Sequence, residues 1–428
     1  MNECSESRSR WLVCGSIVGT LFLIMAALTA LLYYNNRPPQ INIPRHGVPK
    51  SNGWDDFVRA GEMVNSINHL GPYSQTRPMN SWTIPEYESF VRDNTPAFKI
   101  LRCGLNKPYM HPCWRSFSDR DFPSYARIRE MARTLSGEAL YYKTINKPIK
   151  AADSFLDGVE LGVTLPRGGG LITDLVGVAV EMICTKDFPG VIDKLDSEEL
   201  NHVASRLVRI QKKRWPYSEV VLEDGRMSTE EWKEIFTKSS DRKQIMNPGY
   251  WQQDTFCLSS KSNPSLADRA GFVCTNARFA FANKTAILIA IQDYHEAAAR
   301  EQQHPYKKTS RVCVPNTPIL EICNSNLTTA RCARSKAETK LTLIQTYVAL
   351  RRYKLNYGCY PTRLSQLMPG YLKKIPIDPF GLGKPLHYKL LKGGQGYLLY
   401  SVGFDQKDNG GSSGDWYRQD VKGDLLLK

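Results

Sequence analysis

Residues 11–34 read WLVCGSIVGTLFLIMAALTALLYY and contain no charged side chain. An α-helix of this length can cross the hydrocarbon core of a bilayer, which is about 30 Å thick. Trp11 stands at one end and Tyr33 and Tyr34 at the other, and such rings favour the headgroup level. We therefore expect a transmembrane helix at 11–34 after a short tail at 1–10. A cleaved signal peptide is the alternative, although the run is long for one and lacks an A-x-A-like site at its end.

The charges that flank this segment are nearly balanced between its two sides. Arg8 and Arg10 precede it, and Arg37, Arg45 and Lys50 follow it. The usual arrangement of such an anchor keeps the short N-terminus in the cytoplasm and places the bulk of the chain outside it. We therefore expect a single-pass membrane protein whose main part is extracytoplasmic.

The whole chain is basic, with a formal net charge of +15 over 428 residues. Such a charge favours anionic neighbours. No run of five or six basic residues occurs, so a solvated basic surface fits better than a nucleic-acid groove. The expected partners are the membrane, envelope proteins and anionic envelope polymers, and no nucleic acid is expected.

Nine of the eleven cysteines follow the anchor. Outside the cytoplasm some of them would form disulfides, although buried free thiols are an equal alternative. An odd number leaves at least one cysteine free or intermolecular. The local candidate pairs are Cys103 with Cys113, Cys257 with Cys274, and Cys313 with Cys323.

A proline-rich linker at 35–53 is followed by a helical region at 54–332. Apolar residues recur there with a period near 3.6, most clearly over 122–213, where Asp196 and Glu199 form a capping-box pattern. Because each helix has one apolar face, the helices must stack, and we expect an irregular helical array without a tetratricopeptide signature. The remaining expectations are helices at 54–70, 85–92, 97–105, 228–238 and 266–300 and a loop at 302–332.

The pattern changes at 333–428, where a small α+β domain is expected. A basic amphipathic helix at 337–357 ends at Gly358, and two strand candidates follow at 385–391 and 396–402. The predicted fold class is therefore mainly α, with an N-terminal transmembrane helix, a helical array and this C-terminal domain.

Five pieces of this domain occur in a recognisable order. They are the helix that leads into YP at 360–361, IPIDPFG at 375–381, LYSVG at 399–403, the Asp- and Gly-rich loop at 403–411 and the Asp-Val pair at 420–421. In this order the domain resembles the globular part of type II secretion major pseudopilins. The plan of the whole chain is an anchor, helices with LG at 161–162 and GGLITDLVG at 169–177, and then this domain. This plan is similar to that of uncharacterised bacterial membrane-anchored proteins.

The resemblance implies a structural Ca²⁺ in the loop after the second strand, with Asp405, Asp408 and Asp420 as candidate ligands. Calcium takes six to eight oxygen ligands, and the glycines of this loop would allow it to fold around the ion. The loop is not an EF-hand, because Lys407 and Trp416 occupy ligand positions. A solvated hairpin loop without metal is the alternative.

The chain also departs from the pseudopilin pattern. Pseudopilins carry a glutamate inside the apolar helix, which leads directly into the globular domain, whereas this anchor has no acidic residue and the helical region intervenes. Docking into a pilus filament is therefore not expected. The sequence predicts instead that the domain is reused at the end of a membrane-anchored helical protein.

No catalytic motif is complete. The G-x-S-x-G match at 410–414 has no histidine after it, and His295-Glu296 has Ala299 where a zincin needs its second histidine. We therefore expect a non-catalytic scaffold or interaction protein, with a secretion or envelope-assembly accessory role. The alternatives are a calcium-stabilised ligand-binding protein and a cell-envelope hydrolase with its site in the helical region. The hydrolase requires a cleft that gathers several of His69, His111, Asp153, Asp174 and Glu181.

Overall fold

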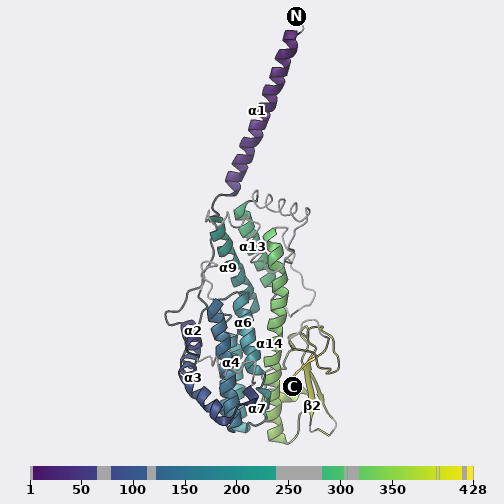
Figure 1. Cartoon of the computed structure of the whole chain (residues 1–428). Helices are drawn as coiled ribbons and strands as arrows, with labels where there is room; N and C mark the ends of the chain where they lie inside the picture. Colours follow the sequence, from purple (N-terminus) through teal and green to yellow (C-terminus); the bar gives the residue numbers. More distant parts are fainter. Residues whose placement is uncertain are drawn as a thin grey trace. The chain divides into compact units, whose positions relative to one another are not determined.

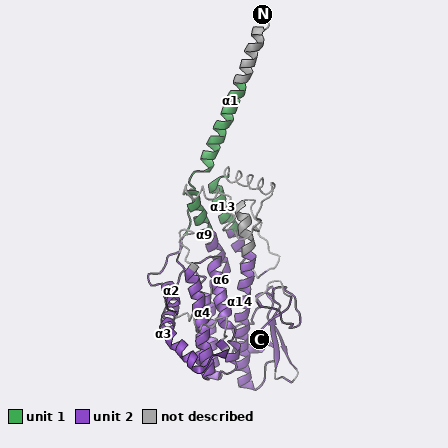
Figure 2. Cartoon of the chain, viewed as in Figure 1, with its two compact units in different colours: residues 1–44, 228–294, 314–322 green, residues 45–227, 295–313, 323–428 purple. Residues whose placement is uncertain are grey.

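Helices form most of the part of the chain that the structure describes (Figure 1). Contacts divide the chain into two units (Figure 2), one made of 1–44, 228–294 and 314–322 and the other of 45–227, 295–313 and 323–428. The computed structural model describes residues 3–64, 79–112, 122–237, 282–302, 306, 318–391, 393–394, 396–416 and 422–427. Each of the three candidate cysteine pairs includes a residue whose side chain lies outside this description.

The first unit begins with the helix α1 (Glu3–Asn35). Its segment Ser16–Asn35 has 20 residues and is strongly apolar, and its most apolar stretch is not buried against the rest of the chain. The helix predicted at 11–34 is therefore confirmed as a helix long and apolar enough to cross a membrane. A signal sequence near the N-terminus can also form a helix that is long and apolar enough by this criterion. Further along this unit, Lys233 of α9 (Tyr217–Thr237) donates from Nζ to the carbonyl oxygen of Ile41 at 3.0 Å.

The second unit is an array of amphipathic helices, which confirms the helical region predicted around 122–213. The part of the predicted helix at 266–300 that is described belongs to α13. The helices are α2 (Gly53–Met63), α3 (Ile84–Leu105), α4 (Phe122–Thr144), α5 (Pro148–Thr164), α6 (Leu171–Thr185), α7 (Pro189–Ile192), α8 (Ser197–Lys213), the first part of α9 (Tyr217–Thr237), the end of α13 (Lys284–Glu301) and most of α14 (Pro318–Tyr357), with a 3-10 turn at Met79–Ser81.

The apolar faces of α3 to α8 meet in one core. Leu135 of α4, Phe155 of α5, Val180 of α6 and Leu207 of α8 are all buried in it. The helix α8 begins at the cap that the sequence predicts. At the start of α8, Glu199 N donates to Asp196 Oδ1 at 2.9 Å while Asp196 N donates to Glu199 Oε2 at 3.0 Å, so the predicted capping box is confirmed.

Two glycines allow α5 and α6 to cross closely. A Cβ atom on Gly162 would lie 2.7 Å from the carbonyl oxygen of Gly177, and a Cβ on Gly177 would lie 2.5 Å from that of Gly162. Any side chain at either position would therefore push the two backbones apart.

Residues 85–92 and 97–105 are helical as predicted, but the break expected between them is wrong, because α3 runs through both. Pro96 lies inside this helix, where it cannot donate the usual backbone hydrogen bond. Phe90 and Phe98 on either side of it are buried, so the core holds both halves in line.

Two later boundaries are also wrong. The helix α9 begins at Tyr217 and not at 228, and α14 begins at Pro318, within the loop predicted at 302–332. The helix predicted at 337–357 is the C-terminal half of α14. Charged residues on the inward faces, such as Glu223 and Arg334, are buried and interrupt the apolar period in these helices.

The C-terminal sheet has three antiparallel strands in the order β1-β2-β3. The strands are β1 (His387–Leu390), β2 (Tyr397–Ser401) and β3 (Leu425–Leu426), so both predicted strands are confirmed. One side of α14 packs on this sheet through Leu343 and Leu350, while Ile344 belongs to the core of the helical array. The domain boundary predicted between 332 and 333 therefore falls inside α14, which packs on both the helical array and the sheet (Figure 1).

Candidate functional site

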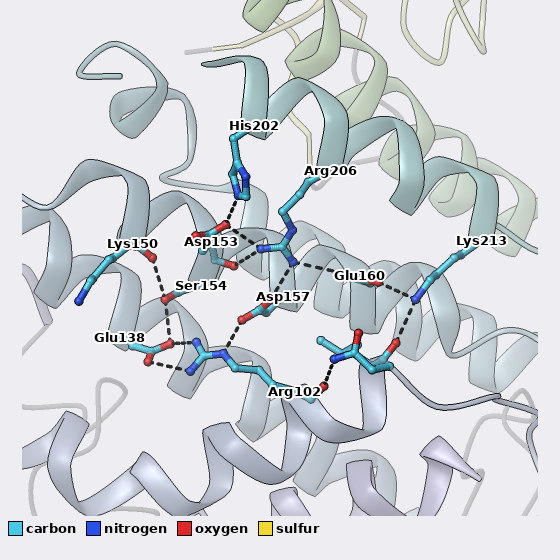
Figure 3. A network of polar contacts seen from close by, with 12 residues as sticks. Arg102, Glu138, Lys150, Asp153, Ser154, Asp157, Glu160, His202, Arg206 and Lys213 are labelled. Atoms are coloured by element: carbon cyan, nitrogen blue, oxygen red, sulfur yellow. Dashed lines mark hydrogen bonds and ion pairs between the residues drawn. The ribbon is translucent and has the colours of Figure 1, made fainter. Parts of the chain in front are cut away.

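A network of ion pairs connects α3, α4 and α5 (Figure 3). Arg102 of α3 contacts Glu138 of α4, with Nη2 2.6 Å from Oε2, and Asp157 of α5, with Nε 2.7 Å from Oδ2. Ser154 donates from Oγ to Glu138 Oε2 at 2.7 Å. Burial raises the pKa of the Glu138 carboxyl, and Arg102 opposes this only in part.

The network continues onto α8. Arg206 contacts three carboxylates of α5, at 2.8 Å from Asp153, 2.8 Å from Asp157 and 3.3 Å from Glu160. Lys213 contacts Glu160, with 2.6 Å between Nζ and Oε1. Each carboxylate of this network is therefore held by a cation from a neighbouring helix, and the arrangement fixes the helices to one another.

A second charged cluster surrounds Arg334 of α14, whose side chain is only 1% exposed. Its guanidinium pairs with the fully buried Asp174 of α6, contacts Glu338 with 2.9 Å between Nε and Oε1, and donates from Nη2 to the carbonyl oxygen of Trp215 at 2.7 Å. Burial lowers the pKa of Arg334, but Asp174 and Glu338 raise it by more, so the guanidinium stays charged.

A pair from the same region extends this cluster. Arg214 donates to both oxygens of Glu181, from Nη1 to Oε1 at 3.0 Å and from Nη2 to Oε2 at 2.5 Å. Such bidentate pairs are the strongest form of an arginine–carboxylate contact. Burial tends to raise the pKa of Glu338, but Arg334 and further arginines lower it by more, so this carboxyl stays ionised.

Beside this cluster lies a cavity of about 370 Å³, which is our candidate functional site. Polar and apolar groups line it from α8, α14 and the turn that carries the IPIDPFG motif. The lining residues are Gln211, Arg214, Arg331, Glu338, Leu341, Thr342, Ile377, Asp378, Pro379 and Gly383. A cavity of this size with a few polar groups on an apolar wall is typical of small-ligand sites.

Asp378 builds one wall of this cavity. Its Oδ1 accepts hydrogen bonds from Phe380 N at 2.9 Å and from Ser401 Oγ at 2.7 Å, and its Oδ2 accepts one from Val402 N at 2.9 Å. Burial raises the pKa of the Asp378 carboxyl, although these donors oppose the shift. The motif aspartate therefore fastens the turn to the end of β2.

The described side chains among those named for a hydrolase do not all meet in one cleft. Asp174 and Glu181 share the cluster around Arg334, whereas Asp153 belongs to the network of Figure 3. His111 is buried beside Trp54 and Tyr125, and His69 lies outside the described residues.

The predicted calcium ligands are described only in part, because Asp420 lies outside the described ranges. Asp405 Oδ1 accepts a hydrogen bond from Lys407 N at 3.1 Å, and Asp408 Oδ1 accepts one from Tyr400 Oη at 2.9 Å. Among the residues with described positions, no group of three His, Cys, Asp or Glu is arranged to hold a metal. Calcium binding stays a prediction.

A further aspartate of this loop was not singled out from the sequence. Asp424 is buried and accepts hydrogen bonds from Asn409 N at 3.1 Å and from Gly411 N at 2.6 Å. Burial raises its pKa, against the effect of these two donors. The loop that contains the G-x-S-x-G match is thus closed by its own backbone contacts to Asp424, and does not form the strand-to-helix turn of a nucleophile elbow.

The cavity residues on α14 were also not predicted as a site. Arg331 and Glu338 line the cavity, and together with Arg334 beside it they are spaced by three and four positions, which places them on one face of the helix. This spacing was the available signal. Comparison with protein-family models, with curated proteins and with solved structures finds no match to this chain.

Proposed function

We propose that the chain is a membrane-anchored, extracytoplasmic scaffold or interaction protein, with an accessory role in secretion or envelope assembly. The main support for this proposal is that buried charged side chains pair with one another and hold helices together. In the part of the second unit that is described, the carboxylates around Arg102 and Arg206, and Asp174 beside Arg334, are paired with cations of other helices. A scaffold uses such pairs to fix its elements, whereas an enzyme needs an acid, base or nucleophile that can meet a substrate.

The membrane part of the proposal is supported by α1. An unburied apolar segment of 20 residues would expose a continuous apolar surface to water, and insertion into lipid removes it. The proline-rich stretch at 35–53 would then act as the spacer between the membrane and the helical array. The charges near α1 fit the extracytoplasmic orientation as well as its reverse, so the orientation follows the usual arrangement of an anchor.

The accessory role is supported by the resemblance to pseudopilins. A long helix packed on a small antiparallel sheet fits that resemblance, and Asp378 of the IPIDPFG motif has a specific part in joining the turn to β2. We include in this proposal a Ca²⁺ bound by Asp405, Asp408 and Asp420.

The test is position-specific photo-cross-linking of the full-length chain in its native membrane. The probe replaces Val208, an exposed residue of α8, or Ile172, an exposed residue of α6. The matched control replaces Val203, a buried valine of α8, and should give no adduct. The proposal predicts discrete adducts with envelope proteins from an exposed position. Adducts with cytoplasmic proteins alone, or none from either exposed position, would contradict it.

A further inference from the structure

Arg331 has an unusual environment for a largely buried arginine. Its side chain is 13% exposed and lines the cavity, yet it makes no hydrogen bond to any residue whose position is described. Its closest carboxylate oxygen is Glu338 Oε2, at 3.9 Å from Nη1, and its guanidinium lies over the ring of Tyr217 at 5.1 Å. A guanidinium carries five N–H donors, and buried donors are normally hydrogen-bonded. A group in the cavity would supply the missing acceptor.

Glu338 offers the complementary half of the site. Its Oε1 accepts the hydrogen bond from Arg334, whereas its Oε2 has only the long contact with Arg331 among the described residues. The cavity therefore presents a donor group and a carboxylate oxygen next to each other, both with hydrogen-bonding capacity left over.

The charge of the surroundings selects the kind of ligand. The cavity and the charged cluster beside it contain three arginines (Arg214, Arg331 and Arg334) and three carboxylates (Asp174, Glu181 and Glu338). Asp378 adds a negative charge to the wall. Glu338 and Asp378 would repel a simple anion, and the arginines would repel a simple cation. A ligand that carries both charges therefore fits best.

We propose that this cavity binds a small zwitterion of the α-amino-acid type, with its carboxylate on Arg331 and its ammonium group on Glu338. The guanidinium fork matches the planar carboxylate, and the Glu338 oxygen accepts from the ammonium group. Leu341, Ile377 and Pro379 line the same cavity and provide an apolar wall for an aliphatic side chain. The site thus gives the scaffold a ligand-binding function and does not depend on the proposed accessory role.

The proposal is tested by isothermal titration of the full-length chain in detergent with three probes. L-Leucine carries both charges, 4-methylpentanoate lacks the ammonium group, and 3-methylbutylamine lacks the carboxylate. We expect L-leucine to bind at least about tenfold more tightly than either analogue, since each loses a charged hydrogen-bonding partner. Equal or tighter binding of 4-methylpentanoate would show a simple anion site and overturn the proposal, as would no binding of L-leucine.

Substitutions identify the two partners. Arg331→Met should weaken L-leucine binding by about tenfold or more, and Arg331→Lys should restore it only in part because it lacks the fork. Glu338→Gln should bring the affinity for L-leucine close to that for 4-methylpentanoate. Arg352→Met, on the same helix but outside the cavity lining, is the matched control and should bind as the wild type does. Thermal melting checks that each variant is folded, and unchanged L-leucine affinity in folded Arg331→Met would refute the site.

Discussion

The buried imidazole of His111 makes a sharp prediction about acid stability. His111 is fully buried, its ring lies 4.7 Å from that of Trp54, and its Nε2 lies 3.2 Å from the hydroxyl of Tyr125. Burial lowers the pKa of this histidine to about 3, from an ordinary value of 6.5. The folded protein therefore keeps His111 neutral under conditions in which the unfolded chain protonates it.

The sign and size of the effect follow from proton linkage. Because the pKa is lower in the folded state, the stabilisation is complete above pH 6.5 and is lost as the pH falls from there towards 3. This difference in pKa lowers the free energy of unfolding by about 2 kcal/mol at pH 5 and by about 3 kcal/mol at pH 4. Typical domains have a total stability of roughly 5–15 kcal/mol, so the loss is measurable.

The assay is guanidinium-induced unfolding of the full-length chain, followed by tryptophan fluorescence at pH 7.5, 6 and 5. His111→Asn should be less stable at pH 7.5 but should lose about 2 kcal/mol less than the wild type between pH 7.5 and pH 5. If His111→Asn loses as much stability as the wild type over this range, the reasoning is refuted.

Three further predictions concern packing and the C-terminal domain. Gly162→Ala, which places a Cβ 2.7 Å from the carbonyl oxygen of Gly177, should reduce the free energy of unfolding by roughly 1–3 kcal/mol in denaturant titrations, and an unchanged midpoint would contradict this. Asp378→Asn turns a buried acceptor into a donor that faces Val402 N, so thermal melting should show a loss of about 1–3 kcal/mol, and wild-type stability would exclude the role assigned to the carboxylate. Chelator should lower the melting temperature of the full-length chain, and Asp405→Asn should reduce this difference; an unchanged melting temperature with chelator would count against the calcium site.

The helices of the core could be predicted because their apolar stripes are regular. Leu135, Val159 and Leu207 recur with neighbours at helical spacing, and each is buried in the common core. The strands of the C-terminal sheet were likewise placed from short apolar runs on either side of a glycine turn. The pattern of one apolar face per element is enough to predict these helices and strands.

The start of α14 and the candidate site could not be predicted in the same way. Charged residues such as Arg334 usually lie at the surface, yet Arg334 is buried because Asp174, 160 residues earlier, neutralises it. A pairing between such distant residues leaves no periodic signal in the sequence. The cavity was missed for the same reason, since its walls come from α8, α14 and the turn around Asp378.

The central claim, that a membrane anchor carries this helical array, is tested most directly by fractionating cells that express the full-length chain. Membranes are washed with alkaline carbonate, and the N-terminal peptide is then identified by mass spectrometry. The account predicts that the chain stays in the washed membranes with residues 11–34 still attached and is released only by detergent. Recovery of the chain in the soluble fraction, or of a mature form that lacks those residues, would contradict it.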